Sequence, residues 1–174
     1  AYMMAVLSDI YGDIPCTEAG MSYINGNANP RYDTQEEVYD FIFSELKACA
    51  AQLGTGSDRI SGDVTSLNSD VTAWKKYANT LRLRYAMRIS DVAPEKARTE
   101  FESALKAESG IISSAEEDAY VKHIKAPFTL YDGANDLDFR ANALGEIIYG
   151  QDPESPSFVS STLFNYMKMM KDPR

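Results

Sequence analysis

Residues 34–54, TQEEVYDFIFSELKACAAQLG, constrain the fold most strongly, because they predict a long helix with both of its ends marked. Thr34 and Glu37 have the spacing of a capping box, in which each side chain satisfies a backbone donor at the start of a helix. Gly54 suits the left-handed backbone that ends many helices. The apolar residues between these ends recur at helical spacing: Val38, Ile42, Leu46, Cys49 and Leu53. The stretch therefore predicts a helix that packs along at least one side.

Residues 70–90 predict a second helix, for which Asp70 is a suitable N-cap. Its apolar residues occupy more than one side: Trp74, Tyr77, Leu81, Leu83, Tyr85, Met87 and Ile89. A helix that is apolar over so much of its circumference packs between neighbours. Five cations also lie along it: Lys75, Lys76, Arg82, Arg84 and Arg88. Because the chain has a net charge of −9, we expect these cations to meet carboxylates of other helices rather than an anionic ligand.

Further helices are predicted toward the C-terminus. Pro94 occupies the first position of a third helix, which Gly110 would end. Its expected inner face is Ala97, Phe101, Ala104 and Leu105. Residues 113–121 predict a short acidic helical turn, and residues 158–171 predict a last helix. On that last helix, the residues expected to face the protein interior are Phe158, Leu163, Tyr166 and Met167 or Met170.

Irregular structure is predicted where Gly, Ser, Pro, Asn and Asp gather. Residues 55–69 predict a solvent loop, and residues 125–157 are irregular apart from a possible helical stretch at 139–149. No stretch predicts a convincing strand. The helices have the spacing of antiparallel pairs in an α-solenoid, so the sequence predicts an all-α fold.

The N-terminal residues AYMMAVLSDI resemble the second half of a helix rather than a signal peptide. This helix breaks at Tyr11-Gly12-Asp13-Ile14-Pro15, where Gly12 can end it and Pro15 prevents it from resuming. We expect a corner with Tyr11 packed beneath it, and not a ligand-binding loop.

Composition excludes several classes of function. A net charge of −9 disfavours nucleic acid and anionic lipid as partners, and no apolar stretch is long enough for a membrane helix. Cys16 and Cys49 are too few for a metal knuckle or a disulfide framework, and we expect Cys49 on an apolar helix face. His123 has no neighbours in sequence for a zinc site or a catalytic dyad. No metal or cofactor is therefore predicted.

Four motifs occur in order along the chain: Tyr11–Pro15, Pro30–Asp33, Trp74–Arg84 and Asp172–Arg174. They match the patterns Tyr-Gly-Asp-x-Pro, Pro-x-Tyr-Asp, Trp-x-x-x-Ala-Asn-x-Leu-Arg-Leu-Arg and Asp-Pro-Arg. In this respect the chain resembles the SusD/RagB family of glycan-binding lipoproteins of Bacteroidetes outer membranes. Cys16 departs from the family, in which an aromatic residue often follows the proline.

The resemblance implies both a fold and a function. It implies tetratricopeptide-like helix pairs that support a loop-rich sugar-binding face, with residues 1–174 forming a single helical domain. Family members run to several hundred residues, so this chain would be an internal portion without the lipid-anchored N-terminus and the C-terminal part. Such proteins lie at the cell surface as a lid over a SusC-like TonB-dependent transporter, take part in nutrient uptake and are not enzymes. Membrane association would come only through the lipid anchor, which this chain lacks.

Sugar-binding sites combine aromatic faces, which stack on the C–H side of a pyranose, with Asn, Asp and Arg, which bond its hydroxyls. Two loop stretches have this composition. The first, residues 21–33, contains Tyr23, Asn25, Asn27 and Tyr32. The second, residues 128–152, contains Tyr131, Asn135, Asp138, Arg140 and Tyr149. The resemblance favours the second stretch, because ligand contacts in the family come from irregular insertions between the helices.

Other interpretations remain for these residues and for the chain. Trp74 is the only Trp, but its position at the start of an apolar helix face predicts a core residue. The oxygen-rich stretch 132–138 lacks the spacing of an EF-hand and is better interpreted as a solvated acidic loop. A glycosidase would need two carboxylates across a cleft, which the sequence alone cannot identify among 26 acids. A helical-repeat scaffold that binds protein is a further alternative.

Overall fold

The computed structural model describes residues 1–56, 61–121 and 159–171. The chain divides into two compact units, residues 1–121 and residues 122–174. The elements of the first unit are α1 (Tyr2–Tyr11), α2 (Ser22–Asn25), α3 (Gln35–Gln52), α4 (Val71–Arg88), α5 (Pro94–Leu105) and the 3-10 turn η1 (Ala115–Glu117). The second unit contains α7 (Ser161–Met169). The described ranges contain helices and no strand, which confirms the predicted all-α class.

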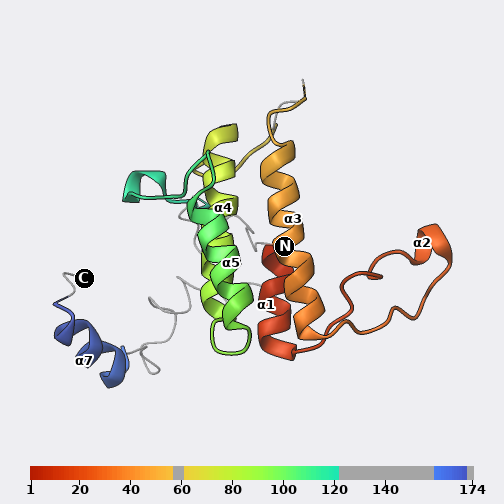
Figure 1. Ribbon diagram of the computed structural model, residues 1–174, viewed down its shortest axis with the longest axis horizontal. Coiled ribbons are helices and arrows are strands. Elements are labelled where there is room, and N and C mark those ends of the chain that lie inside the picture. The colour runs from red at the N-terminus through yellow and green to blue at the C-terminus, as the bar shows by residue number, and fades with distance from the viewer. Residues whose placement is uncertain (57–60, 122–158, 172–174) are drawn as a thin grey trace, which may run out of the picture. The chain divides into compact units, whose positions relative to one another are not determined.

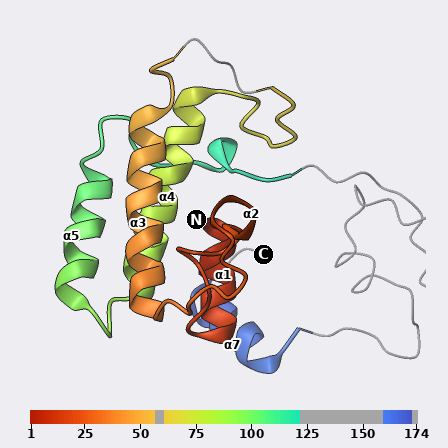
Figure 2. The same ribbon diagram turned by 90° about the vertical axis from the view of Figure 1, so that its right-hand side faces the viewer.

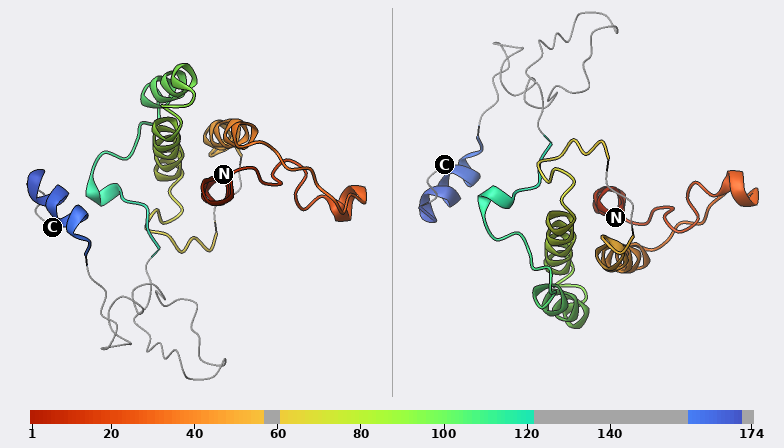
Figure 3. Two further views of the ribbon diagram at one scale, coloured as in Figure 1. Left: turned by 90° about the horizontal axis from the view of Figure 1, so that it is seen from below. Right: turned by 90° about the horizontal axis from the view of Figure 1, so that it is seen from above.

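Four helices of the first unit pack in the spatial order α1, α3, α4, α5, so that each helix contacts the next. Figures 1 and 2 show that consecutive helices of this row run in opposite directions. Figure 3 shows the same helices seen along their length, as neighbours of one another. This arrangement has the tetratricopeptide-like architecture that the sequence predicted.

Helix α3 forms as its end signals predict. The Glu37 N–H donates to Thr34 Oγ1 over 3.3 Å, and the Thr34 N–H donates to Glu37 Oε2 over 2.8 Å. At the other end Gly54 has a left-handed φ of 76°. The buried residues of α3 are Val38, Tyr39, Ile42, Phe43 and Leu46. Tyr39 and Phe43 extend the predicted stripe, because α3 packs against both α1 and α4.

The predicted burial of Cys49 is wrong, because this side chain is exposed. Figure 1 shows that α1 runs beside only the first half of α3, so none of the described helices covers that side of α3 near its C-terminus. The other thiol, Cys16, is buried in the core instead. Both cysteines are free.

Helix α4 begins at the predicted cap, where Asp70 Oδ1 accepts the Ala73 N–H over 2.9 Å. Its buried apolar residues are Ala78, Leu81, Tyr85 and Ala86, and Ile89 follows at its C-cap. Met87, which was expected on a second apolar side, is exposed. Trp74 is half-buried, donates from Nε1 to Asp63 Oδ2 over 3.0 Å and packs edge-on against Tyr77. Trp74 is thus part of the packed structure and does not form an open stacking platform.

Cations of α4 pair with carboxylates of other segments, as expected. Arg88 contacts Asp9 of α1 at 2.9 Å, and Lys76 pairs with Glu117 of η1. The buried Arg82 donates to Glu100 of α5 over 3.3 Å and to Ser103 Oγ over 2.9 Å. These ion pairs join α4 to neighbouring elements and confirm the expectation for three of the five cations. Among the described residues, no ion pair involves Lys75 or Arg84.

Helix α5 has Pro94 in its first turn but ends at Leu105, before the predicted end at Gly110. Ala97 and Ala104 are buried, whereas Leu105 is exposed against expectation. Helix α5 packs mainly against α4 and contacts α3 through the ion pairs Lys47–Glu100 and Lys96–Asp40, so it buries only a narrow apolar stripe. Asn79 of α4 instead fixes the turn after α5, donating to Ser109 Oγ and to the Gly110 carbonyl over 3.0 Å each.

The remaining described segments differ more from expectation. In the predicted solvent loop, Leu67 is buried, and the loop pairs with the segment after η1 through the isolated bridge between Thr65 and Val121. In α7, Leu163 and Tyr166 were expected inside but are exposed, and Met170 at the C-cap, one of two alternatives, is exposed as well. Met167 of that helix is half-buried. Phe158, His123 and the possible helix at 139–149 lie outside the described residues.

Candidate functional site

The corner that follows α1 is a compact turn. Gly12 has φ 77°, and its N–H donates to the Ser8 carbonyl over 2.8 Å. Ile14 and Cys16, which follow, are buried in the core beneath the turn. The expectation that Tyr11 packs there is wrong, because the Tyr11 side chain is 71% exposed. The space beneath the corner is filled by the residues after the turn and not by the tyrosine before it.

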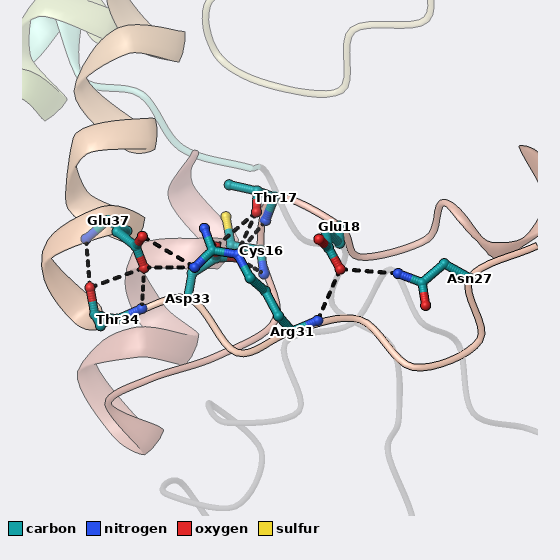
Figure 4. A network of polar contacts seen from close by, with 8 residues as sticks. All are labelled: Cys16, Thr17, Glu18, Asn27, Arg31, Asp33, Thr34 and Glu37. Atoms are coloured by element: carbon teal, nitrogen blue, oxygen red, sulfur yellow. Dashed lines mark hydrogen bonds and ion pairs between the residues drawn. The ribbon is translucent and has the colours of Figure 1, made fainter. Parts of the chain in front are cut away.

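Asp33 holds this corner against the start of α3 (Figure 4). Its carboxylate accepts the N–H groups of Cys16 and Thr17 over 2.9 Å and 2.7 Å, and it also accepts the Thr17 hydroxyl. Arg31 contacts the same carboxylate at 2.7 Å. The backbones of Asp33 and Ile14 are joined by two further hydrogen bonds, of 3.0 Å and 3.2 Å. We call Cys16, Thr17, Arg31 and Asp33 the clamp.

The hydrogen bonds of the clamp stabilise the buried negative charge of Asp33. The Asp33 side chain is 0% exposed, and burial alone would favour its neutral form. The hydrogen bond from the Thr17 N–H, together with those from the Thr17 hydroxyl and the Cys16 N–H, lowers the pKa of Asp33 below its usual value, and the Arg31 charge adds to this effect. The carboxylate is therefore ionised, and it links residues that are 16 or 17 positions apart.

The other acid of the corner also has a structural partner. Asp13 Oδ1 accepts the Gln35 N–H at the first turn of α3 over 2.9 Å. A carboxylate at a helix N-terminus satisfies a free backbone donor and interacts favourably with the helix dipole. In return, Gln35 Nε2 donates to the Ser8 carbonyl over 2.9 Å. Asp13 thus joins the corner after α1 to the start of α3.

Beyond the clamp, residues 17–32 form an arm that projects from the helices and carries α2 at its far end (Figure 1). Glu18 braces the arm, because its Oε2 accepts Asn27 Nδ2 over 3.0 Å and the Arg31 N–H over 3.1 Å (Figure 4). Within the arm, Asn25 Oδ1 accepts the Asn27 N–H over 2.9 Å. The polar side chains predicted as sugar contacts therefore also shape the arm itself.

The aromatic residues of the arm are open to solvent. Tyr23 lies in α2 and is 99% exposed, and its neighbour Ile24 is also exposed. Tyr32 is 70% exposed and lies next to Asp33, at the base of the arm. The structure thus places the two predicted tyrosines at opposite ends of the arm. Exposed apolar side chains on a projecting, hydrogen-bonded segment are typical of a binding surface.

The other five predicted contacts lie outside the described residues: Tyr131, Asn135, Asp138, Arg140 and Tyr149. The acidic stretch 132–138 lies there too. Within residues 1–56, 61–121 and 159–171, no three His, Cys, Asp or Glu side chains come together as a metal site would require. Over the same ranges, no helix has the length and apolar character needed to cross a membrane.

Sequence reasoning missed the clamp, although a signal was present. Thr34 already provides the N-cap of α3, so the Asp immediately before it is not needed for capping. Because Asp33 is not needed to cap the helix, its carboxylate can be expected to accept hydrogen bonds from another segment. Its partners, Cys16 and Thr17, come from a different motif and could not be deduced from local spacing.

Comparisons with known proteins agree on one family. The model of the SusD-like family, described as starch-binding associating with outer membrane, matches residues 1–174. A solved Bacteroidetes SusD-like structure is 41% identical with a TM-score of 0.82, covering 99% of this chain and 31% of that one. A solved chitin-binding protein is 33% identical with a TM-score of 0.73, covering 99% and 33%.

A further solved structure is a chitin-binding SusD homolog from Flavobacterium johnsoniae. It is 34% identical, with a TM-score of 0.61, and the match covers 68% of this chain and 25% of that one. No curated protein matches the chain. The chain therefore spans about a third or less of the length of these solved relatives.

Proposed function

This chain belongs to the SusD-like family, and on that premise we propose that its parent protein binds glycan at the cell surface without turning it over. The observation that carries the proposal is the family match over residues 1–174, together with alignment to two solved chitin-binding proteins at 33% and 34% identity. By parent protein we mean a chain of the length of those relatives.

The arm supports this proposal physically. A tyrosine ring that is exposed on a braced segment can stack on a pyranose while losing little side-chain entropy. Tyr23 and Tyr32 offer two such rings, and the bonds of Glu18 and Asp33 hold the segment that carries them. We assign the two tyrosines to glycan contact on this basis.

The second predicted stretch belongs to the same proposal. Tyr131 and Tyr149 would supply further stacking faces, and Asn135, Asp138 and Arg140 would bond glycan hydroxyls. The support for these residues is their composition, since aromatic and amide or charged groups on irregular segments are what sugar sites use.

The cellular setting is proposed from the family alone. The family description places its members at the outer membrane. We propose that the parent protein is anchored there by lipid, covers a SusC-like TonB-dependent transporter and delivers glycan to it for nutrient uptake. Co-purification of the parent protein with such a transporter from outer membranes would test this part.

The test of the central function uses the full-length parent protein. We expect calorimetric titration with starch and chitin oligosaccharides to show saturable binding of at least one series. Incubation with the same oligosaccharides should release no reducing sugar. Release of reducing sugar would favour the glycosidase alternative, and binding of neither series would favour a helical-repeat scaffold for protein partners.

A further inference from the structure

A cavity opens between the C-terminal ends of α3 and α5, against α4. Its volume is about 610 Å³, within the range of ~300–1,000 Å³ that small-molecule sites occupy. Charged and hydroxyl side chains are prominent among those that line it: Lys47, Lys75, Arg82, Ser103, Glu108 and Ser109. Its apolar lining consists of alanines, and none of the described residues around it is aromatic. Because the cavity offers no stacking face, a ligand in it is held by polar groups.

The charge of this cavity is opposite to that of the chain. Three cations line it, Lys47, Lys75 and Arg82, and the one carboxylate among the described lining residues is that of the exposed Glu108. A further carboxylate, that of the buried Glu100, pairs with both Lys47 and Arg82. Even with Glu100 counted, cations outnumber carboxylates, in a chain whose net charge is −9. Lys75 forms no ion pair within the part of the chain that the structure describes. The local charge therefore favours a negatively charged ligand.

Hydrogen-bond donors also exceed acceptors around the cavity. Arg82 is 4% exposed, and only its two Nη atoms donate to the side chains around it. Its Nε has no partner among the described residues, although buried donors are nearly always satisfied. The Ser103 and Ser109 hydroxyls each accept a hydrogen bond, and neither donates one within the described ranges. A ligand that accepts several hydrogen bonds at once fits these groups, and a carboxylate does so best beside a guanidinium.

We propose that this cavity binds the carboxylate of an acidic sugar, a uronic acid unit of a glycan. Lys75 and Arg82 pair with the carboxylate, and Ser103 and Ser109 donate to oxygens of the same sugar. The choice of a sugar rests on the proposed glycan function, whereas the negative charge of the ligand rests on the cavity alone. A protein partner is disfavoured, because it needs pockets for apolar anchors and the alanines of the lining offer only methyl groups. The site is separate from the tyrosines of the arm.

Calorimetric titration of the full-length protein tests the charge of the ligand. The probes are oligosaccharides of galacturonic acid and of glucuronic acid, each compared with its uncharged methyl ester. We expect saturable binding of at least one acid form, weakened by added salt, and binding of its ester weaker by on the order of tenfold. Equal binding of acid and ester would overturn the inference, as would tighter binding of a glutamate peptide than of either acid series. A protein that binds starch or chitin oligosaccharides but neither uronic acid series would lose this inference and keep the proposed function.

Two cations of α4 form a matched pair that tests the location. Lys75 lines the cavity, whereas Arg84 is exposed and does not line it, and neither forms an ion pair among the described residues. We expect Lys75→Gln to weaken binding of the acid form on the order of tenfold and Arg84→Gln to leave it unchanged. Glu108→Gln removes the lining carboxylate and should strengthen binding severalfold. Equal effects of Lys75→Gln and Arg84→Gln, or weaker binding in Glu108→Gln, would overturn the inference.

Discussion

The base and the tip of the arm differ in burial: the base buries a hydrogen-bonded polar side chain, and the tip exposes an aromatic one. At the base, Asp33 is fully buried and its carboxylate accepts hydrogen bonds from two residues and pairs with a third. At the tip, Tyr23 is almost completely exposed, and its hydroxyl makes no hydrogen bond within the part of the chain that the structure describes. The base is organised for rigidity and the tip for access.

The residues of two family motifs lie at the base of the arm, and the exposed tyrosine proposed to contact the ligand lies at its tip. The motifs Tyr11–Pro15 and Pro30–Asp33 meet at the corner and the clamp, where they join α1 to α3. Tyr23 lies outside both motifs. Tyr32 lies within the second motif, next to Asp33. The motif residues Asp13 and Asp33 therefore build the support, and under the proposed function Tyr23 would vary with the glycan more freely than Tyr32.

Removing the clamp should have the largest effect. We expect Asp33→Ala in the full-length protein to lower Tm by roughly two to five degrees, because the buried N–H groups of Cys16 and Thr17 lose their acceptor. Scanning calorimetry measures the change. Asp91→Ala, at an exposed position of the turn after α4, serves as the control and should leave Tm almost unchanged. Equal shifts for both variants would contradict the role of the clamp.

The contribution of Asp33 should depend on pH. Because the pKa of Asp33 is lowered in the folded state, its stabilisation is fully present above the unfolded value, about pH 4, and is lost as pH falls through the lower folded value. We therefore expect the Tm difference between the natural protein and Asp33→Asn to be constant from pH 7 to about pH 5 and to shrink below about pH 4. A difference that stays constant down to pH 2.5 would show that the charge is not what stabilises the corner.

The second predicted stretch offers a comparison with the tip. We expect Tyr131→Ala and Tyr149→Ala each to weaken glycan binding by the full-length protein on the order of tenfold, as the loss of one stacking face would. Titration with a bound oligosaccharide measures the change. Unchanged affinity in both variants would show that these two tyrosines of residues 128–152 do not contact glycan, and the arm would remain as the proposed contact.

The brace of the arm should have the smallest effect. Glu18→Ala removes the acceptor of the half-buried Asn27 Nδ2 bond and of the exposed Arg31 N–H bond. We expect roughly two- to fivefold weaker glycan binding, with little change in Tm. Hydrogen exchange should show faster exchange at the Arg31 amide. A Tm loss as large as that of Asp33→Ala would mean that the arm is not separable from its base.

Local signals predicted the helices well, and the structure shows why. The caps of α3 and α4 depend on residues three positions apart, so Thr34, Glu37 and Asp70 could be recognised in sequence. Burial depends on which neighbours a helix has. The exposure of Cys49 and Leu105 follows from the short α1 and from the position of α5 at the end of the row, which no local pattern contains.

The candidate site was predictable only in part. The composition of residues 21–33 indicated tyrosines on a loop that could contact sugar. Both tyrosines are exposed, and their contact with glycan stays a prediction. The clamp was not predictable, because it joins Asp33 to residues 16 and 17 positions earlier through backbone donors that any amino acid except proline could supply. Tyr11 was misassigned for the same reason, since the corner is filled by Ile14 and Cys16 once the clamp has formed.

The central claim is that exposed tyrosines of the arm bind glycan, and one titration tests it most directly. The full-length protein, the double variant Tyr23→Ala/Tyr32→Ala and the control Tyr120→Ala are titrated with the same oligosaccharide. Tyr120 is also an exposed tyrosine, but it lies beyond η1 and outside the arm. The account predicts a loss of at least tenfold in affinity for the double variant at unchanged Tm, and natural affinity for the control. Natural affinity in the double variant would contradict it.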